Sequence, residues 1–203
     1  MQKRLILTVS REFGSGGHVI AEALARRFEL DLYDNNLLEH IAEEKNVGGD
    51  VLKRYDERPK NRLFSRTVRG YSNSIQENVA NMQFDYLKKL ARDGKSFVVV
   101  GRCSETILKG YEGLVSIFVL GDREVKRERI MRLYRLSAEE AEHMMARKDW
   151  ERKSYHNYYC KGKWGDSRNY DLSINSSRLG IDRTVDLLEA YVRARMEDPA
   201  LRR

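Results

Sequence analysis

The sequence has few of the residues that mark specialised classes of protein. Its 203 residues include only two cysteines, Cys103 and Cys160, and two prolines. Because the cysteines lack the Cys-x-x-Cys spacing, we expect neither a disulfide framework nor a zinc knuckle. With 14 glycines and no internal repeat, the chain is neither collagen-like nor of low complexity. It has no long uncharged apolar run, which excludes a membrane span, and we expect a reduced, cytoplasmic protein.

The sequence is rich in charge. Lys and Arg total 38 against 31 Asp and Glu, which gives a formal net charge of +7. Hydrophobic residue types make up 41% of the chain, which suffices to bury one core at this length. The positive charge favours an anionic partner and leaves open whether it is a nucleic acid, a membrane surface or a small phosphate.

Short apolar runs alternate with helical patterns along the chain. Runs of nearly continuous apolar residues are typical of central parallel strands covered on both faces, and the sequence has three: Leu5–Val9, Ser96–Val100 and Leu114–Leu120. Shorter strands are predicted at Leu30–Tyr33 and Tyr170–Ile174. Helices are predicted between them, one of which starts at a capping box at Ser137 and runs to about Trp150. This alternation predicts an α/β protein with a parallel sheet and helices on both faces.

Three segments are harder to interpret. We expect loops with short helical pieces at Val47–Thr67, and a mobile, basic, aromatic loop at Lys153–Asn169. The Arg/Glu-rich helix Arg123–Arg135 is interpreted as a solvated face with intrahelical ion pairs, with Val125, Ile130 and Leu133 inward. His143 and His156 are expected at the surface, Cys103 as a small buried residue, and no Cys/His pair has a metal-ligand spacing.

A glycine-rich turn directly follows the first predicted strand. In Gly14-Ser15-Gly16-Gly17-His18 the glycines permit positive φ, so consecutive backbone N–H groups can form an anion cradle. The following helix N-terminus adds unpaired donors, which makes polyphosphate the natural ligand. The Walker A pattern is not met, because Gly17 stands in place of the lysine and His18 in place of Ser/Thr. A tight strand–helix turn with no ligand is the alternative.

From this turn onward the chain resembles the cytidylate kinase-like family of P-loop nucleoside monophosphate kinases. The resemblance covers nearly the whole chain, and together its motifs are fairly specific. They are Thr8 to Gly17, Tyr33-Asp34, Val100-Gly101-Arg102, Arg147 to Arg152, Trp164-Gly165-Asp166 and Tyr170 to Gly180. The resemblance implies a three-layer P-loop kinase fold and phosphoryl transfer from ATP to CMP or dCMP with Mg²⁺.

The resemblance also implies roles for particular residues, with Arg11 added because it begins the turn. The ATP phosphates would be bound by Arg11, Gly14, Ser15, Gly16, Gly17 and His18. The catalytic residues would be Arg147, Arg152 and Asp34. The acceptor would be bound by Arg102, Cys103, Asp149, Asn35 and His40, with Arg102 on its phosphate and Asp149 on its ribose. The loop beside the donor's adenine would be Asn175, Ser176 and Ser177.

Three departures from the family pattern bear on the chemistry. Gly17 removes the lysine that holds the terminal phosphates, Cys103 replaces the aspartate that reads the cytosine amino group, and His40 stands where a second phosphate-binding arginine is expected. Phosphoryl transfer mainly needs positioning and positive charge, so arginine can replace the lysine electrostatically. Arg11, Arg147 and Arg152 are the candidates.

The lid arginines and the metal site each have a plain alternative. Arg147 and Arg152 lie about 140° apart on an ideal helix, so they converge only if the helix bends or ends near Trp150. Their alternative is a solvated surface whose ion pairs contribute little. Asp34 could hold Mg²⁺ through water, helped by the hydroxyl of Ser15, or it could cap the following helix.

We therefore expect a single kinase-like domain over residues 1–203. Its core would be 1–34, 94–150 and 170–195, its acceptor-binding segment about 35–93, and its lid about 147–169. The partners would be small-molecule nucleotides, without membrane or nucleic acid, and the sequence leaves the oligomeric state open. Two alternatives stand beside this function: a catalytically silent nucleotide-binding regulatory protein, and a nucleic-acid-binding protein that uses the aromatic, basic loop.

Overall fold

The centre of the molecule is a five-stranded parallel sheet. The computed structural model describes residues 4–45, 67–68, 71–72 and 75–197, so the predicted loop at 47–67 lies outside the described residues except for Thr67. The strands are β1 (Ile6–Arg11), β2 (Asp31–Tyr33), β5 (Phe97–Val100), β6 (Leu114–Leu120) and β7 (Leu172–Asn175). They are ordered β2-β5-β1-β6-β7, with every neighbouring pair parallel. A separate antiparallel pair joins β3 (Thr67–Val68) to β4 (Tyr71–Ser72).

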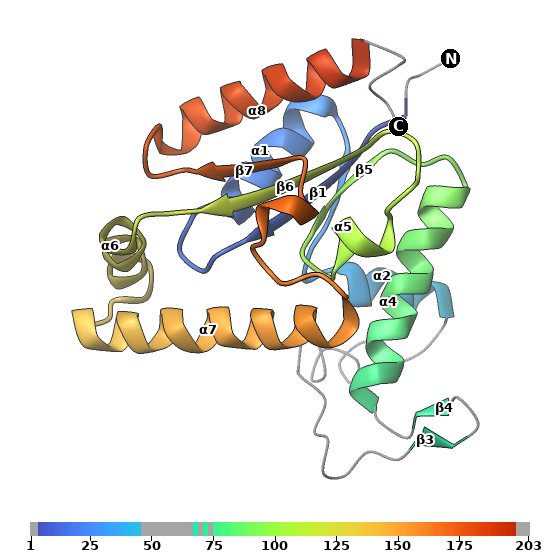
Figure 1. Ribbon diagram of the computed structural model, residues 1–203, viewed down its shortest axis with the longest axis horizontal. Coiled ribbons are helices and arrows are strands. Elements are labelled where there is room, and N and C mark those ends of the chain that lie inside the picture. Colours follow the sequence, from blue (N-terminus) through green and yellow to red (C-terminus); the bar gives the residue numbers. More distant parts are fainter. Residues whose placement is uncertain (1–3, 46–66, 69–70, 73–74, 198–203) are drawn as a thin grey trace.

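Helices cover both faces of this sheet. Side chains alternate between faces along a strand, so Leu7 and Val9 of β1 enter one core and Ile6 enters the other. The first core is closed by α1 (Gly17–Phe28) and α8 (Gly180–Glu197), and the second by α2 (Leu37–Lys45) and α4 (Ile75–Arg92). Figure 1 shows α1 beside α8, and α2 beside α4 on the other side of the molecule. The predicted three-layer α/β fold is confirmed.

The chain continues through α5 (Ser104–Ile107), α6 (Arg123–Tyr134), α7 (Ala138–Tyr159) and a short 3₁₀ helix, η1 (Ser167–Asn169). The predicted start of α7 is confirmed. Ser137 accepts a hydrogen bond from the Glu140 N–H, and the Glu140 carboxylate accepts one from the Ser137 N–H, as a capping box requires.

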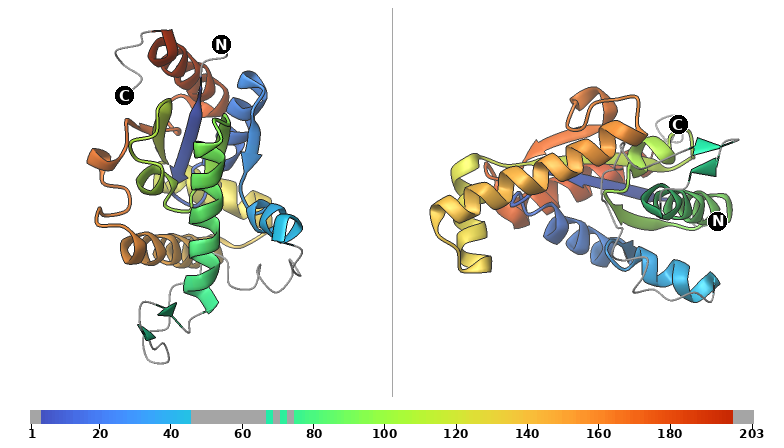
Figure 2. Two further views of the ribbon diagram at one scale, coloured as in Figure 1. Left: turned by 90° about the vertical axis from the view of Figure 1, so that its right-hand side faces the viewer. Right: turned by 90° about the horizontal axis from the view of Figure 1, so that it is seen from below.

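The predicted end of that helix is wrong. Figures 1 and 2 show α7 as one unbroken helix, and it runs to Tyr159, so Lys153–Tyr159 is helical rather than loop. Aromatic packing extends it, because Tyr155 lies in a buried cluster and the ring of Tyr159 meets that of Phe84 edge-on at 5.3 Å. Tyr155 is therefore not available to stack on a nucleic-acid base.

The interpretation of the charged helix α6 also needs correction. Ile130 is buried as expected, but Val125 and Leu133 are exposed. Lys126 is buried instead, and Arg123 pairs with Glu142 of α7 at 2.8 Å rather than within its own helix. The charges of α6 therefore join it to other elements.

The sheet topology predicts a ligand-binding position at the carboxyl end of β1. From β1 the chain moves to β2 on one side, and later to β6 and β7 on the other, so the strand order reverses beside β1. In open α/β sheets ligands bind at such a reversal, outside the carboxyl ends of the strands. Among the described residues, no helix combines the length and the apolar character needed to cross a bilayer.

Candidate active site

The glycine turn has the backbone conformation that the sequence predicts. Gly14 and Gly16 have φ of 84° and 81°, in the left-handed region that side chains disfavour. Gly17 is required for a different reason: a Cβ there would lie 2.5 Å from the Cβ of Arg11. The turn therefore excludes any side chain at residue 17, including the lysine of a Walker A motif.

Ser15 faces into the turn rather than out of it. Its hydroxyl donates to the carbonyl of Glu12 at 2.8 Å and accepts from the Gly17 N–H at 3.3 Å. The hydroxyl of Ser176 donates to the Ser15 carbonyl at 2.5 Å, and both serines are fully buried. Ser15 thus holds the shape of the turn, and its hydroxyl is not presented to a ligand.

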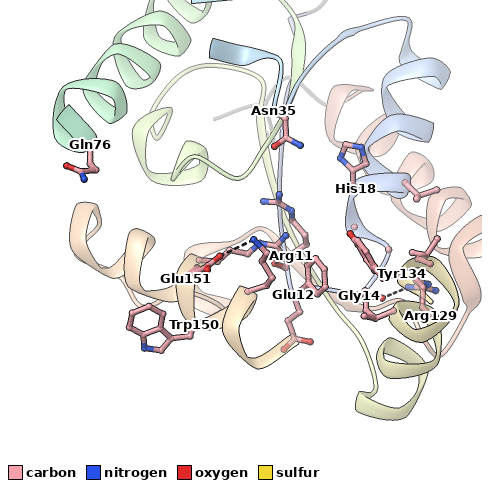
Figure 3. Close-up of a pocket in the computed structure, with 18 residues that line it drawn as sticks. Arg11, Glu12, Gly14, His18, Asn35, Gln76, Arg129, Tyr134, Trp150 and Glu151 are labelled. Atoms are coloured by element: carbon pink, nitrogen blue, oxygen red, sulfur yellow. Dashed lines mark hydrogen bonds and ion pairs between the residues drawn. The ribbon is translucent and has the colours of Figure 1, made fainter. Parts of the chain in front are cut away.

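A cavity of about 870 Å³ opens beside the turn. Gly14, Gly16, Gly17 and His18 line it, together with four cationic side chains: Arg11, Arg129, Lys148 and Arg152. Figure 3 shows Gly14, Arg129 and Tyr134 at one end of the cavity, and Gln76 and Trp150 at the other. Two carboxylates, Glu12 and Glu151, also line the cavity, and Glu151 pairs with Lys148 at 3.2 Å. The volume suits a small organic ligand, and the excess of cations favours an anionic one.

Helix α7 contacts the turn through two charged residues. Asp149 accepts a hydrogen bond from the Phe13 N–H at 2.6 Å, and Arg152 donates to the Arg11 carbonyl at 3.3 Å. The guanidinium of Arg152 also lies over the Phe13 ring, 5.4 Å from its centre. Burial raises the pKa of Asp149, and the bond from Phe13 partly opposes that rise. Asp149 therefore anchors the turn and does not line the cavity.

Helix α6 supplies contacts that sequence reasoning missed. Arg129 donates to the Gly14 carbonyl at 2.6 Å, and burial lowers its pKa. Lys126 pairs with Glu12 at 2.7 Å, and Glu12 also accepts from the Gly121 N–H. In the sequence these residues belong to a uniformly charged helix, and no local signal distinguishes them. Only the fold brings them to a turn more than 100 residues earlier.

The two arginines predicted at the lid are not brought together. Because α7 continues past Trp150, the condition for their convergence is not met. Arg152 lines the cavity, whereas Arg147 is exposed and outside its lining.

The predicted adenine loop lies behind the turn. Asn175 donates to the Asp122 carboxylate at 2.8 Å, Ser177 accepts from the Asp122 N–H at 2.9 Å, and Ser176 holds the Ser15 carbonyl. These contacts tie the loop to the start of α6 and to the turn. None of the three residues lines the cavity.

At the carboxyl end of β2, Asn35 lines the cavity and Asp34 lies close by. The Asp34 carboxylate accepts from the Asn36 N–H at 3.1 Å and lies 3.5 Å from Nδ1 of His18. His40 packs against the ring of Tyr33, with centres 5.4 Å apart, and is not part of the cavity lining.

Arg102 and Cys103 follow β5 in a strained conformation. Both have positive φ, 61° and 55°, which is uncommon for residues other than glycine and occurs often at binding sites. Arg102 is buried and donates to the Asp34 carbonyl at 3.1 Å. A second cavity of about 20 Å³ is lined by Arg11, Arg102 and Arg152 among others, so three arginines from three elements converge there.

Comparisons with known proteins agree with this geometry. The family model described as the cytidylate kinase-like family matches residues 6–178. The solved structure of an uncharacterized protein from Eubacterium ventriosum is 33% identical, with a TM-score of 0.76, over 95% of this chain and 100% of that one. No curated protein matches the chain.

Shikimate kinases share the fold. The enzyme from Bacteroides thetaiotaomicron is 12% identical with a TM-score of 0.55, over 93% of this chain and 98% of that one. The enzyme from Acinetobacter baumannii, solved with shikimate, is 10% identical with a TM-score of 0.53, over 94% of each chain. These likenesses are to the fold alone. The family match covers most of the chain and supports nucleotide-dependent phosphoryl transfer in general terms. The chain belongs to the cytidylate kinase-like family.

Proposed function

We propose that this protein transfers the terminal phosphoryl group of ATP to a nucleoside monophosphate such as CMP or dCMP. The observation that carries the proposal is the cavity that the glycine turn shares with Arg11, Arg129, Lys148 and Arg152. The transferred group passes through a transition state with charge spread over its oxygens, so catalysis rests on positioning and on cations. Backbone N–H groups at the start of α1 add donors for the ATP phosphates.

Arg11 takes over the position of the missing lysine in this proposal. Its Cβ lies where a side chain at residue 17 would begin, and its side chain lines the cavity. The side chain of Arg152 donates a hydrogen bond to the backbone carbonyl of Arg11. Guanidinium groups stay charged and can donate two hydrogen bonds to one phosphate, so a pair of arginines can supply the positive charge of one ammonium.

Asp34 fits a Mg²⁺ ion that is bound mainly by the substrate. Mg²⁺ prefers oxygen ligands, keeps several waters, and is commonly held through one or two carboxylates together with substrate phosphates. The Asp34 carboxylate is one-fifth exposed and adjoins cavity-lining His18, whereas the hydroxyl of Ser15 is already bonded within the turn. Such an ion would neutralise charge on the ATP phosphates.

We assign the acceptor's phosphate to Arg102; the cavity of about 20 Å³ that Arg102 shares with Arg11 and Arg152 holds about one water, so it must widen when the acceptor binds. Asn35, which lines the large cavity at the end of β2, would contact the acceptor. Cys103 is buried beside Arg102 and offers only a weak donor and acceptor to a base. We therefore expect weaker discrimination among bases than an aspartate at that position would give.

The test measures ADP release with ATP, Mg²⁺ and each acceptor in turn: CMP, dCMP, UMP, AMP and shikimate. We expect the fastest turnover with CMP or dCMP, lost in Arg152→Ala. Turnover with shikimate alone would overturn the choice of acceptor. Thermal stabilisation by ATP without transfer to any acceptor would overturn the enzyme and support a silent nucleotide-binding protein, an alternative that the glycine at residue 17 favours.

A further inference from the structure

A second cluster of reactive side chains lies away from the large cavity. Glu105 of α5 and His156 and Cys160 of α7 place their ligating atoms within 4.8 Å of one another, and all three residues are buried. Figure 1 shows α5 close to the C-terminal end of α7, where these residues meet. His156 was expected at the surface, and that prediction is wrong because Nε2 of its ring meets the Glu105 carboxylate at 2.7 Å.

The donor atoms point toward one another. His156 and Cys160 are four residues apart on a helix, so they share a face. One sulfur, one imidazole nitrogen and one carboxylate oxygen therefore converge from α5 and α7. Cys103, which follows β5, is buried in the same hydrophobic cluster as Cys160. Without a metal, the three converging atoms are linked by hydrogen bonds. A metal ion bound to the same atoms would take the place of the shared protons.

We propose that Glu105, His156 and Cys160 bind a buried, tetrahedral Zn²⁺ ion, with the thiol of Cys103, which lies in the same cluster as Cys160, as the fourth ligand. The mixed sulfur, nitrogen and oxygen set is the one that zinc takes, whereas Mg²⁺ and Ca²⁺ take oxygen alone. Zinc bonds of about 2.0–2.3 Å place ligand atoms about 3.3–3.8 Å apart in a tetrahedron. The 2.7 Å contact between His156 and Glu105 would then open by about 0.6 Å, and any separation near the group's limit of 4.8 Å would close by about 1 Å. Binding displaces the thiol protons and leaves a neutral imidazole.

Neighbouring residues hold the ligands in orientation. The Glu105 carboxylate accepts from the hydroxyls of Ser10 at 3.3 Å and Thr106 at 3.2 Å. The other ring nitrogen of His156, Nδ1, lies 3.4 Å from the amide oxygen of Asn157, which directs Nε2 toward Glu105. Outer partners of this kind accompany most protein zinc sites and fix the tautomer of the histidine.

The zinc would have a structural effect at a defined place. It would join the end of α7 to α5 and to the residue that follows Arg102, at the smaller cavity that Cys103 and His156 help to line. With four protein ligands the zinc would have no position for a substrate, as in structural zinc sites, and Cys103 would hold the metal rather than contact an acceptor base. Zinc binding can therefore be tested independently of phosphoryl transfer.

The experiment uses the full chain, kept reduced by a phosphine, stripped with a chelator and dialysed against Zn²⁺. We expect one zinc per chain by mass spectrometry of the metal. Co²⁺ in its place should show the intense absorption of a tetrahedral ion and a thiolate-to-cobalt charge-transfer band. Loss of a residue that only orients a ligand weakens metal binding about 10–100-fold. Cys160→Ser and His156→Gln each remove a ligand itself, so each should weaken zinc binding about 100-fold or more.

The matched control is His143→Ala, which removes an exposed histidine on the same helix next to Glu139. It should leave both the stoichiometry and the cobalt spectrum unchanged. The native chain alone decides the question if the variants do not fold, because the charge-transfer band requires a thiolate ligand. No stoichiometric zinc in the reduced native chain, a cobalt spectrum without that band, or equal binding by folded Cys160→Ser would each overturn the proposal.

Discussion

Helix α7 contacts the rest of the protein in two ways along its length. Near its middle, Asp149 and Arg152 meet the glycine turn beside a cavity of about 870 Å³. One to two turns later, Tyr155, His156 and Cys160 meet α5 and α4 in a region closed to solvent. Both regions use charged or polar side chains, but only the first has room for a ligand the size of a nucleotide.

Polar side chains have different roles in the two regions. Cations that line an open cavity can meet the phosphates of a ligand there, even where a carboxylate of the protein also pairs with them. Polar groups in a closed region must satisfy one another, or share a metal, because an unpaired buried polar group is costly. The distinction assigns ligand binding to the first region and a fixed connection to the second, and substitutions can test each assignment separately.

The largest expected effect is on catalysis at the open region. Arg152→Ala should lower kcat of phosphoryl transfer about 10³-fold, because arginines on the transferred group contribute about 10³–10⁵ in related reactions. The melting temperature should also fall slightly, since the change removes the hydrogen bond to the Arg11 carbonyl and the contact with the Phe13 ring. Steady-state ADP release measures the first and thermal unfolding the second.

Two variants sharpen that result. Lys153→Ala removes an exposed cation from the next position of α7 and should leave kcat within a factor of about two, as expected for a solvated charge. Arg147→Ala decides between family resemblance and geometry. We expect a far smaller loss than for Arg152→Ala, because Arg147 lies outside the cavity lining. Equal losses would show that α7 moves to bring both arginines to the phosphates.

The second prediction concerns Asp149, which the resemblance assigns to the acceptor ribose and the structure bonds to the turn. Asp149→Ala leaves the Phe13 N–H without its acceptor and should destabilise the protein by about 1–3 kcal/mol. KM for ATP should rise while KM for the acceptor stays constant. Asp149→Asn keeps an acceptor oxygen and should lose less on both measures. A rise confined to the acceptor's KM would restore the ribose role.

The third prediction concerns the packing of the turn against β1. Gly17→Ala should destabilise the protein by about 1–3 kcal/mol, the usual effect of overpacking, since its Cβ would lie 2.5 Å from that of Arg11. The same change in an Arg11→Gly background should have a much smaller effect on the free energy of unfolding, measured with denaturant. Additive effects in this double-mutant cycle would show that the two positions do not compete for space.

The sequence was most informative where a signal is local. The central strands were predicted because strands buried on both faces leave nearly continuous apolar runs, as at Leu114–Leu120, where Ser116 alone is polar. The glycine turn was predicted because positive φ needs glycine at Gly14 and Gly16 themselves. The capping box at Ser137 was predicted because all its partners lie within four residues. Such features need no knowledge of the rest of the fold.

The sequence was least informative where polar residues are buried by distant partners. His156 is paired with Glu105, 51 residues earlier, and Lys126 with Glu12, 114 residues earlier. In sequence, these residues belong to polar stretches that resemble a solvated helix or a loop. The length of α7 was underestimated for the same reason, because Tyr155 and His156 form its inward face although neither is aliphatic. The family resemblance pointed to both Arg147 and Arg152, and only the structure shows that Arg152 lines the cavity and Arg147 does not.

The smallest expected effect lies at the other end of α7, where the helix begins in solvent. Hydrogen bonds from the backbone and hydroxyl of Ser137 lower the pKa of Glu140. A group with a lowered folded-state pKa binds fewer protons in the folded than in the unfolded protein. The contribution of Glu140 to the free energy of unfolding is therefore complete above its pKa in the unfolded protein, near 4.5. That contribution is lost as the pH falls through the lower pKa of the folded protein. Glu140→Gln does not titrate and lacks this dependence.

The difference in unfolding free energy between the native chain and Glu140→Gln should accordingly be largest near neutral pH and shrink below about pH 4.5. Denaturant unfolding of both proteins at several pH values measures it. Glu139→Gln is the matched control, since Glu139 lies one residue away, is exposed and has no part in the capping box. The difference in unfolding free energy between the native chain and Glu139→Gln should not shrink as the pH falls. A pH-independent difference for Glu140→Gln would mean that the carboxylate stabilises the first turn of α7 no better than an uncharged amide. The solvent-exposed end of the helix would then owe its stability to the hydroxyl of Ser137 alone, whereas the C-terminal end relies on groups that water does not reach.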